Sequence, residues 1–129
     1  MRKPVIAGNW KMFKRLGDAV ETALALKPKV ANAGHCEVVL APAFVHIKTL
    51  ADRLEGSNIR LSAQDAAPVS DDSANTGEVS AGMLVDIGCT YAIVGHSERR
   101  QLFKEDELSL AKKLHIVEEH GMIPVFCIG

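Results

Sequence analysis

The sequence predicts an α/β fold in which parallel strands alternate with helices. Short apolar runs typical of buried strands alternate with longer stretches of helical spacing, almost without linkers between them. Such alternation indicates parallel strands joined by right-handed crossovers. Polar residues come directly after several of the apolar runs, as expected where functional side chains lie at the carboxyl ends of the strands of a sheet. An open doubly wound sheet and part of a closed (β/α)8 barrel both fit this order of elements.

The composition is that of an ordinary soluble chain, and one domain over residues 1–129 is expected. The 129 residues are 47% hydrophobic, which is enough to bury a substantial core. With 15 basic and 16 acidic residues, no net field attracts nucleic acid or a membrane, and neither partner is expected. The apolar run after Lys3 is too short for a signal peptide or a membrane span, so we expect a cytoplasmic protein.

The first strand is predicted at residues 5–8, and strand alternation places Asn9 and Lys11 on one face of the sheet. The stretch Gly8-Asn9-Trp10-Lys11 puts a bulky Trp and a Lys where the dinucleotide-binding pattern GxGxxG needs glycines. A dinucleotide fold is therefore not expected. Asp18 and Glu21 have the spacing of a capping box and predict the start of the first helix.

Two further strands and a second helix are predicted before residue 66. The apolar runs 37–42 and 59–63 predict the second and third strands. Between them, apolar residues recur at helical spacing over 47–54, and Gly56 follows where a left-handed residue would end the helix. Residues 66–78 are rich in Ser, Asp, Asn and Gly and predict the longest loop, which could be a lid, a contact arm or slack.

The remaining residues predict two helices and two strands. Ser80 is the predicted N-cap of a short helix that Gly88 ends, and the fourth strand follows at 91–94. Asp106 is the predicted start of a longer helix, and the fifth strand is predicted at 124–128. The predicted buried stripe of the longer helix is Leu110, Ala111, Leu114 and Val117.

Cysteine and histidine spacing predicts no metal site. The cysteines are odd in number and lack CxxC spacing, so reduced, buried thiols are expected. Four of the histidines show no ligand pattern either and are expected on the surface or on a helix face. These residues are Cys36, Cys89 and Cys127, and His35, His46, His115 and His120.

The fifth histidine, His96, is the strongest candidate for chemistry. It follows the fourth apolar run and Gly95, and Ser97-Glu98-Arg99-Arg100 come next. If these residues begin a helical turn, His96 lies at the positive end of its backbone dipole, which disfavours imidazolium. A neutral ring can donate a hydrogen bond to a carbonyl that becomes an enolate. A structural histidine bonded to a backbone carbonyl is the alternative.

Six segments together resemble the triosephosphate isomerase family, in the family's order and spacing. Asn9-Trp10-Lys11 and Gly95 to Arg100 are the most specific of these matches. The six segments are residues 5–12, 41–42, 63–64, 76–81, 93–100 and 124–129. The resemblance implies a TIM barrel, which has eight strands and about 250 residues. The chain would then be an incomplete barrel, the N-terminal part of a single (β/α)8 domain with about five strands.

The resemblance also implies an activity and roles for single residues. The family interconverts dihydroxyacetone phosphate and D-glyceraldehyde 3-phosphate through an enediolate, with no cofactor. Asn9 and Lys11 match substrate-contacting positions, and the Lys11 cation would favour both the phosphate dianion and the enediolate. His96 matches the electrophile, whose neutral state is a feature of the family itself. Ser97 and Glu98 match supporting positions beside the site.

Some parts that the resemblance implies are not among these 129 residues. The family's glutamate base belongs to a later strand, and its phosphate cradle follows strands seven and eight. Because general-base catalysis is worth about 10²–10⁴-fold, we expect the chain alone to be essentially inactive. The alternative is a non-catalytic half-barrel, a structural module that self-associates or binds a complementary C-terminal half through its open edges.

The chain departs from the family's pattern in two places, one of them a pair of residues. Ala74-Asn75 stands before Thr76-Gly77-Glu78, where the family carries a glycine and an aromatic residue in a loop that enters the neighbouring subunit. We therefore expect the contact of the family's homodimer to be altered. Asp65 stands where Asn is common, and we expect this change to be neutral.

Overall fold

The computed structural model describes residues 2–129 and forms one parallel sheet with helices between its strands. The strands are β1 (Val5–Asn9), β2 (Glu37–Ala41), β3 (Ile59–Ala63), β4 (Cys89–Val94) and β5 (Ile123–Phe126). The helices are α1 (Leu16–Lys29), α2 (Phe44–Arg53), α3 (Ala81–Asp86), α4 (Ser97–Gln101) and α5 (Glu107–Glu119). The strand order is β1-β2-β3-β4-β5, and each neighbouring pair is parallel, so the predicted α/β class is confirmed.

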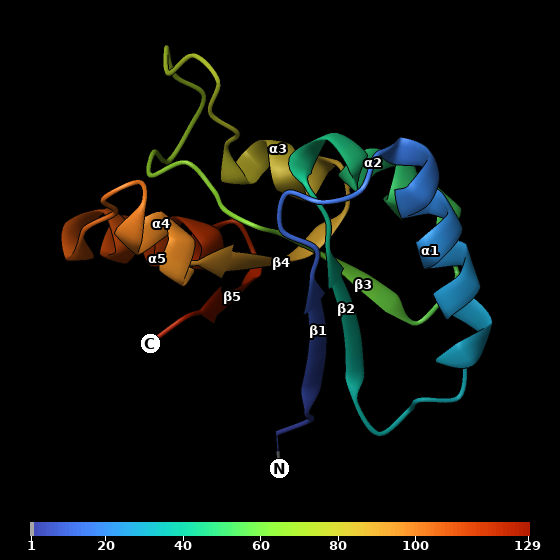
Figure 1. Cartoon of the computed structure of the whole chain (residues 1–129). Coiled ribbons are helices and arrows are strands. Elements are labelled where there is room, and N and C mark those ends of the chain that lie inside the picture. The colour runs from blue at the N-terminus through green and yellow to red at the C-terminus, as the bar shows by residue number, and fades with distance from the viewer. Residues whose placement is uncertain (1) are drawn as a thin grey trace.

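The sheet is curled, and this curvature decides between the two predicted architectures. Figure 1 shows the strand direction turning from β1 to β5, with α1 and α2 outside one end of the sheet and α4 and α5 outside the other. A doubly wound sheet would carry helices on both faces. Here the strands and helices form an incomplete TIM barrel, with β1 and β5 at the two edges of the described sheet.

The core lies between the sheet and the helices that cover its convex face. Alternate residues of the strands, such as Leu40, Leu61 and Val94, pack there against buried helix residues. Full burial of such a side chain stabilises the fold by about 1.5–3 kcal/mol. The main helix residues of this core are Ile47 and Leu50 of α2, Leu84 of α3, and Leu110 and Val117 of α5.

Two of the three predicted helix caps are confirmed. The Ser80 hydroxyl accepts a hydrogen bond from the Met83 amide, and the Asp106 carboxylate accepts one from the Ser109 amide at 2.8 Å. The capping box at Asp18 is wrong, because α1 begins at Leu16 with Arg15 as its N-cap. Asp18 lies in the first turn instead, where a carboxylate still interacts favourably with the helix dipole.

The predicted buried stripe of α5 is partly wrong. Leu110 and Val117 are buried as expected, whereas Ala111 is exposed. Lys113 and Ile116 take the remaining buried positions. A lysine is rarely buried without a partner, and Lys113 has two carboxylates beside it.

One histidine lies on a helix face as expected but is buried there, and one cysteine is less buried than expected. His46 is buried on α2, where its Nε2 lies 3.0 Å from the Lys14 carbonyl oxygen in the segment between β1 and α1. Cys36 and Cys89 are buried free thiols, and burial raises the pKa of Cys89 to about 12. Cys127 is only partly buried, because β5 ends at Phe126 and leaves it beyond the strand.

Within residues 2–129, no helix combines the length and the apolar character needed to cross a bilayer. In the same part of the chain, no three His, Cys, Asp or Glu side chains are grouped so that they could hold a metal ion.

Candidate active site

The residues predicted for the site lie where strands β1 and β4 end. Asn9 is the last residue of β1, and Lys11 lies in the turn that follows. His96 comes two residues after the end of β4 and is the N-cap of α4. Because the strands are parallel, these exits belong to the same rim of the curled sheet, which is where (β/α) barrels place their chemistry.

Glu98 joins Lys11 and His96, although they lie far apart in the sequence. Lys11 Nζ donates to Glu98 Oε1 at 2.5 Å, and His96 Nδ1 is in contact with Glu98 Oε2. The hydrogen bond from Lys11 holds the pKa of the Glu98 carboxyl below its usual range. The amine and the imidazole that sequence analysis singled out therefore meet at one carboxylate.

The backbone of Lys11 is held in a left-handed conformation that non-glycine residues rarely adopt. Its φ is +53°, a conformation that costs a residue with a side chain about 1–2 kcal/mol. Asn9 Oδ1 accepts a hydrogen bond from the Lys11 amide at 2.9 Å, and Gln64 Nε2 donates to the Lys11 carbonyl at 2.9 Å. Gln64 also donates to the Ala41 carbonyl at 2.7 Å. These bonds offset the cost and direct the lysine side chain toward Glu98.

Gln64 is a site residue that sequence reasoning did not single out. It follows β3, and the polar residues after that strand were the available signal. Its partners are backbone carbonyls of two other segments, and no local pattern in the sequence reports such contacts.

The turn before His96 is fixed by Gly95 and Arg100. Gly95 has φ +78°, and the Arg100 guanidinium lies 3.0 Å from where a Cβ would stand. Arg100 Nε donates to the Gly95 carbonyl at 2.7 Å, and its terminal nitrogen donates to the Cys127 carbonyl at 2.5 Å. Arg100 thus ties the exit of β4 to the exit of β5 beneath His96.

The contacts of the His96 ring bear on its hydrogen-bonding state. A carboxylate is an acceptor, so the contact of Glu98 Oε2 with Nδ1 favours the tautomer that carries its proton on Nδ1. A neutral ring with its proton on Nδ1 presents Nε2 as an acceptor. The Ser97 hydroxyl lies 3.4 Å from the same Nδ1 and is a second polar group on that side of the ring.

A cavity of about 240 Å³ opens beside His96, between the exits of β4 and β5. Its walls combine residues around the α4 turn with two residues that follow β5. The lining residues are Gly95, His96, Ser97, Arg100, Gln101, Cys127 and Gly129.

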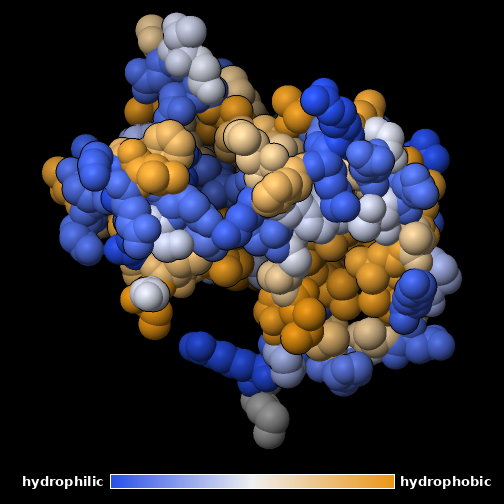
Figure 2. Space-filling view, in the orientation of Figure 1, coloured by the Kyte–Doolittle hydropathy of each residue, from blue (hydrophilic) through white to orange (hydrophobic). Residues whose placement is uncertain are grey.

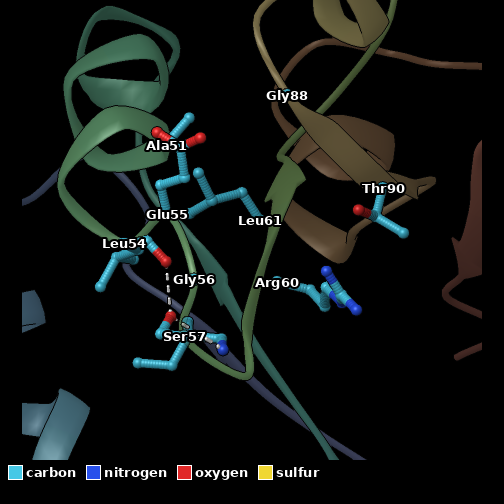
Figure 3. A pocket seen from close by; sticks show the side chains of 10 residues that line it. Ala51, Leu54, Glu55, Gly56, Ser57, Arg60, Leu61, Gly88 and Thr90 are labelled. Atoms are coloured by element: carbon cyan, nitrogen blue, oxygen red, sulfur yellow. Dashed lines mark hydrogen bonds between the residues drawn. The ribbon is translucent and has the colours of Figure 1, made fainter.

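A second cavity of about 240 Å³ lies at the opposite, amino ends of β3 and β4. Figure 3 shows it between the end of α2, the turn around Gly56, and Arg60 and Thr90 of the two strands. The Ser57 hydroxyl donates to the Leu54 carbonyl at 2.7 Å in its wall. None of the predicted site residues lines this cavity, so the rim with His96 remains the candidate active site.

Comparisons with known proteins agree on one family. A family model described as triosephosphate isomerase matches residues 4–129. The triosephosphate isomerase of Geotalea uraniireducens is 47% identical over 129 residues, which is 100% of this chain and 51% of that protein. That of Clostridium botulinum is 43% identical with the same shares. The chain therefore spans about half the length of the curated relatives it matches.

The fold comparison gives the same result. The crystal structure of triosephosphate isomerase from Bartonella henselae matches this structure with a TM-score of 0.91 at 29% sequence identity. The match covers 99% of this chain and 52% of that chain. Because the family model matches nearly every residue and the curled sheet has the same form, the chain belongs to the triosephosphate isomerase family.

Proposed function

We propose that the chain supplies Asn9, Lys11 and His96 to a triose-phosphate isomerase, which interconverts dihydroxyacetone phosphate and D-glyceraldehyde 3-phosphate. The observation that carries the proposal is the meeting of Lys11 and His96 at Glu98, on the rim where strands β1 and β4 end. An ammonium and an imidazole that contact the same carboxylate are close enough to bind one small anionic substrate together.

Each residue has a distinct role in the proposed reaction. The Lys11 ammonium attracts the phosphate dianion and stabilises the negative charge that develops on the enediolate. His96 donates a hydrogen bond from Nε2 to the substrate carbonyl while a base removes a proton from the adjacent carbon. Asn9 holds the Lys11 turn through its amide oxygen. No cofactor takes part, because the proton only moves between neighbouring carbons.

The proposed role of His96 requires a change at Glu98. Donation from Nε2 by a neutral ring leaves Nδ1 without a proton, so the Glu98 carboxylate has to withdraw from Nδ1. Glu98 keeps Lys11 as its partner after withdrawal, and the Ser97 hydroxyl is then close enough to turn its proton toward Nδ1. Ser97 and Glu98 are thus supporting residues that set which ring nitrogen carries the proton.

The proposal assigns the general base and the phosphate cradle to a segment outside these 129 residues. The chain spans about half of each relative, and the family places both parts after its fifth strand. Without them the chain lacks a proton acceptor worth about 10²–10⁴-fold in rate and the contacts that position the phosphate. We therefore propose that the chain alone has negligible isomerase activity.

A reconstitution assay tests this function. The 129-residue chain is assayed with D-glyceraldehyde 3-phosphate, alone and after mixing with the C-terminal half of the Geotalea uraniireducens relative. Activity is expected only in the mixture, and His96→Gln should abolish most of it while His115→Gln, an exposed position on α5, leaves it unchanged. A turnover number for the chain alone that is close to that of full-length enzymes of the family would contradict the proposal. An active mixture containing His96→Gln would contradict it too.

A non-catalytic role in association is the second candidate, and one observation favours it. Large apolar side chains are exposed at both edges of the sheet, notably Val5 and Ile6 on β1 and Ile123 on β5. Such edges pair readily with another chain, so the partner would be a second copy or a complementary half. A mixture that assembles but never isomerises the substrate would favour this function.

A further inference from the structure

Four charged side chains cluster behind the candidate active site, between the exit of β3 and helices α4 and α5. Lys113 Nζ lies 2.7 Å from Asp65 Oδ1 and is also in contact with Glu105 Oε2. Arg99 Nε lies 3.1 Å from Asp65 Oδ2 and 3.2 Å from Glu105 Oε2. The side chains of Lys113, Glu105 and Asp65 are 3%, 4% and 14% exposed, so these three are shielded from water, whereas that of Arg99 is 34% exposed.

The two carboxylates serve the two cations in different ways. Glu105 meets both cations with the single oxygen Oε2, while its Oε1 is buried and has no hydrogen-bond partner among the described residues. Asp65 gives one oxygen to each cation, Oδ1 to Lys113 and Oδ2 to Arg99. Asp65 therefore bridges α5 and α4 with both of its oxygens, and it balances the two positive charges together with Glu105.

Helix α4 depends on ion pairs with the rest of the fold, because it is too short to be stable by itself. It has five residues, none of them buried, and a single turn of this length is unstable without tertiary contacts. Arg99 lies in its middle, and the Arg99 amide donates to the His96 carbonyl at 2.9 Å. An ion pair that holds the Arg99 side chain in place therefore also holds the turn that carries His96 and Glu98.

The residue before Asp65, Gln64, also holds a segment of the candidate site. Gln64 and Asp65 are adjacent just after β3 ends at Ala63, and their side chains reach two different segments. Gln64 holds the carbonyl of Lys11, while Asp65 holds Arg99 of α4. One dipeptide therefore connects the turn that presents Lys11 to the turn that presents His96.

We propose that Asp65 is a positioning residue, which fixes α4 through Arg99 and so sets the placement of Glu98 and His96 relative to Lys11. The proposal deepens the proposed function and rests on it, since the residues positioned are those of the isomerase site. Sequence analysis expects Asp in place of Asn to be neutral here, and the two cationic partners of Asp65 lead this proposal to expect the opposite. An amide there is neutral and has one acceptor oxygen in place of two, so Glu105 would be the one carboxylate left in the cluster for Arg99 and Lys113.

The test replaces Asp65 with Asn and observes a group that Asp65 does not touch. In the 129-residue chain, the Glu98 carboxyl is titrated by carbon-13 NMR and the amides of α4 are followed by hydrogen exchange. With Asp65→Asn we expect the titration midpoint of Glu98 to move upward, because a looser α4 weakens the hydrogen bond from Lys11, and we expect faster exchange in α4. Neither measurement requires isomerase activity, so an inactive chain still tests the proposal.

Two further variants keep the result interpretable. Asp65→Asn combined with Lys113→Met leaves Arg99 and Glu105 as a balanced pair, which protects folding. Glu98 should still titrate higher, because Arg99 has lost its ion pair with the exit of β3. Asp52→Asn is the matched control, since Asp52 forms an exposed pair with Lys48 at 2.8 Å and should leave Glu98 unchanged. An unchanged Glu98 midpoint and unchanged α4 exchange in the folded double variant would show that Asp65 only stabilises the fold. An equal shift in the control would also overturn the proposal.

Discussion

At the scale of single residues, Glu98 is the group on which the geometry of the site depends. It accepts a hydrogen bond from Lys11 and contacts Nδ1 of His96, so it couples the two candidate catalytic groups. The hydrogen bond from Lys11 is the main cause of the lowered pKa of Glu98, and partial desolvation opposes it. The ionised form of Glu98 is therefore maintained by the same lysine that the proposed function assigns to the substrate.

Removing the Lys11 ammonium should return Glu98 to ordinary behaviour. In Lys11→Met we expect the pKa of Glu98, followed by carbon-13 NMR, to rise because its hydrogen-bond donor is gone. A carboxyl whose pKa is lowered by folding contributes stability above its unfolded pKa and loses that contribution as the pH falls through its folded pKa. The variant should lose this acid-side dependence of unfolding. Lys14→Met, in the same loop, is the control, and an unchanged Glu98 in Lys11→Met would refute the coupling.

Sequence reasoning singled out Lys11, His96 and Glu98 at the rim, but not Gln64 or the buried ion pairs behind α4. Lys11 and His96 were recognisable because specific polar residues follow apolar strands locally. The burial of Lys113 and His46 was not predicted, because it depends on partners from other segments. These partners are Asp65 and Glu105 for Lys113 and the Lys14 carbonyl for His46. No periodicity within one helix reports whether a charged side chain will meet a counter-charge across the fold.

At the scale of elements, the turn between β4 and α4 determines where His96 points. Gly95 adopts φ +78°, and an added Cβ would lie 3.0 Å from the Arg100 guanidinium and 3.2 Å from Leu110. The same guanidinium joins the exits of β4 and β5 through two carbonyls. A side chain at this position would disturb the backbone and the Arg100 bridge together.

Gly95→Ala should therefore destabilise the chain. We expect a loss of about 1–2 kcal/mol in the free energy of unfolding from the left-handed backbone alone, measured by urea denaturation. Displacement of Arg100 adds to this loss. Gly17→Ala is a control of opposite sign, because Gly17 lies in α1 with no atom within 4 Å of the added Cβ, and it should stabilise by roughly 0.5–1 kcal/mol. Equal effects of the two substitutions would contradict the strain assigned to Gly95.

The elements themselves were largely predictable because their signals are local. Apolar runs predicted all five strands to within a few residues. The N-cap residues Ser80 and Asp106 predicted where α3 and α5 begin. The start of α1 was missed because Arg15 provides no side-chain cap, so the chain offered no local signal there. The short α4 was anticipated only as a turn after His96.

At the scale of the whole molecule, alternation of strands and helices could not distinguish an open sheet from part of a barrel. The distinction lies in the curvature of the sheet, which depends on how all strands and helices pack together, and the family resemblance supplied it in advance. In the structure the two edges remain open, and Val5 and Ile6 on β1 are 44% and 62% exposed. Figure 2 shows hydrophobic residues gathered in the lower middle of the view, where Figure 1 places β1 and β2.

Open edges with exposed apolar side chains predict association of the chain through β1 and β5, where unpaired backbone groups and apolar area are available together. Sedimentation velocity should show assemblies that grow with concentration and give way to one defined complex when the C-terminal half of a relative is added. Ile6→Lys should weaken the assemblies and the complex alike, because a lysine on an edge strand opposes further strand pairing. Val45→Lys is the control and should weaken neither, because Val45 lies on α2, is 80% exposed and is away from either edge. If Val45→Lys dissociates the assemblies and Ile6→Lys does not, association uses the helical face, and the sheet edges are not what holds the copies together.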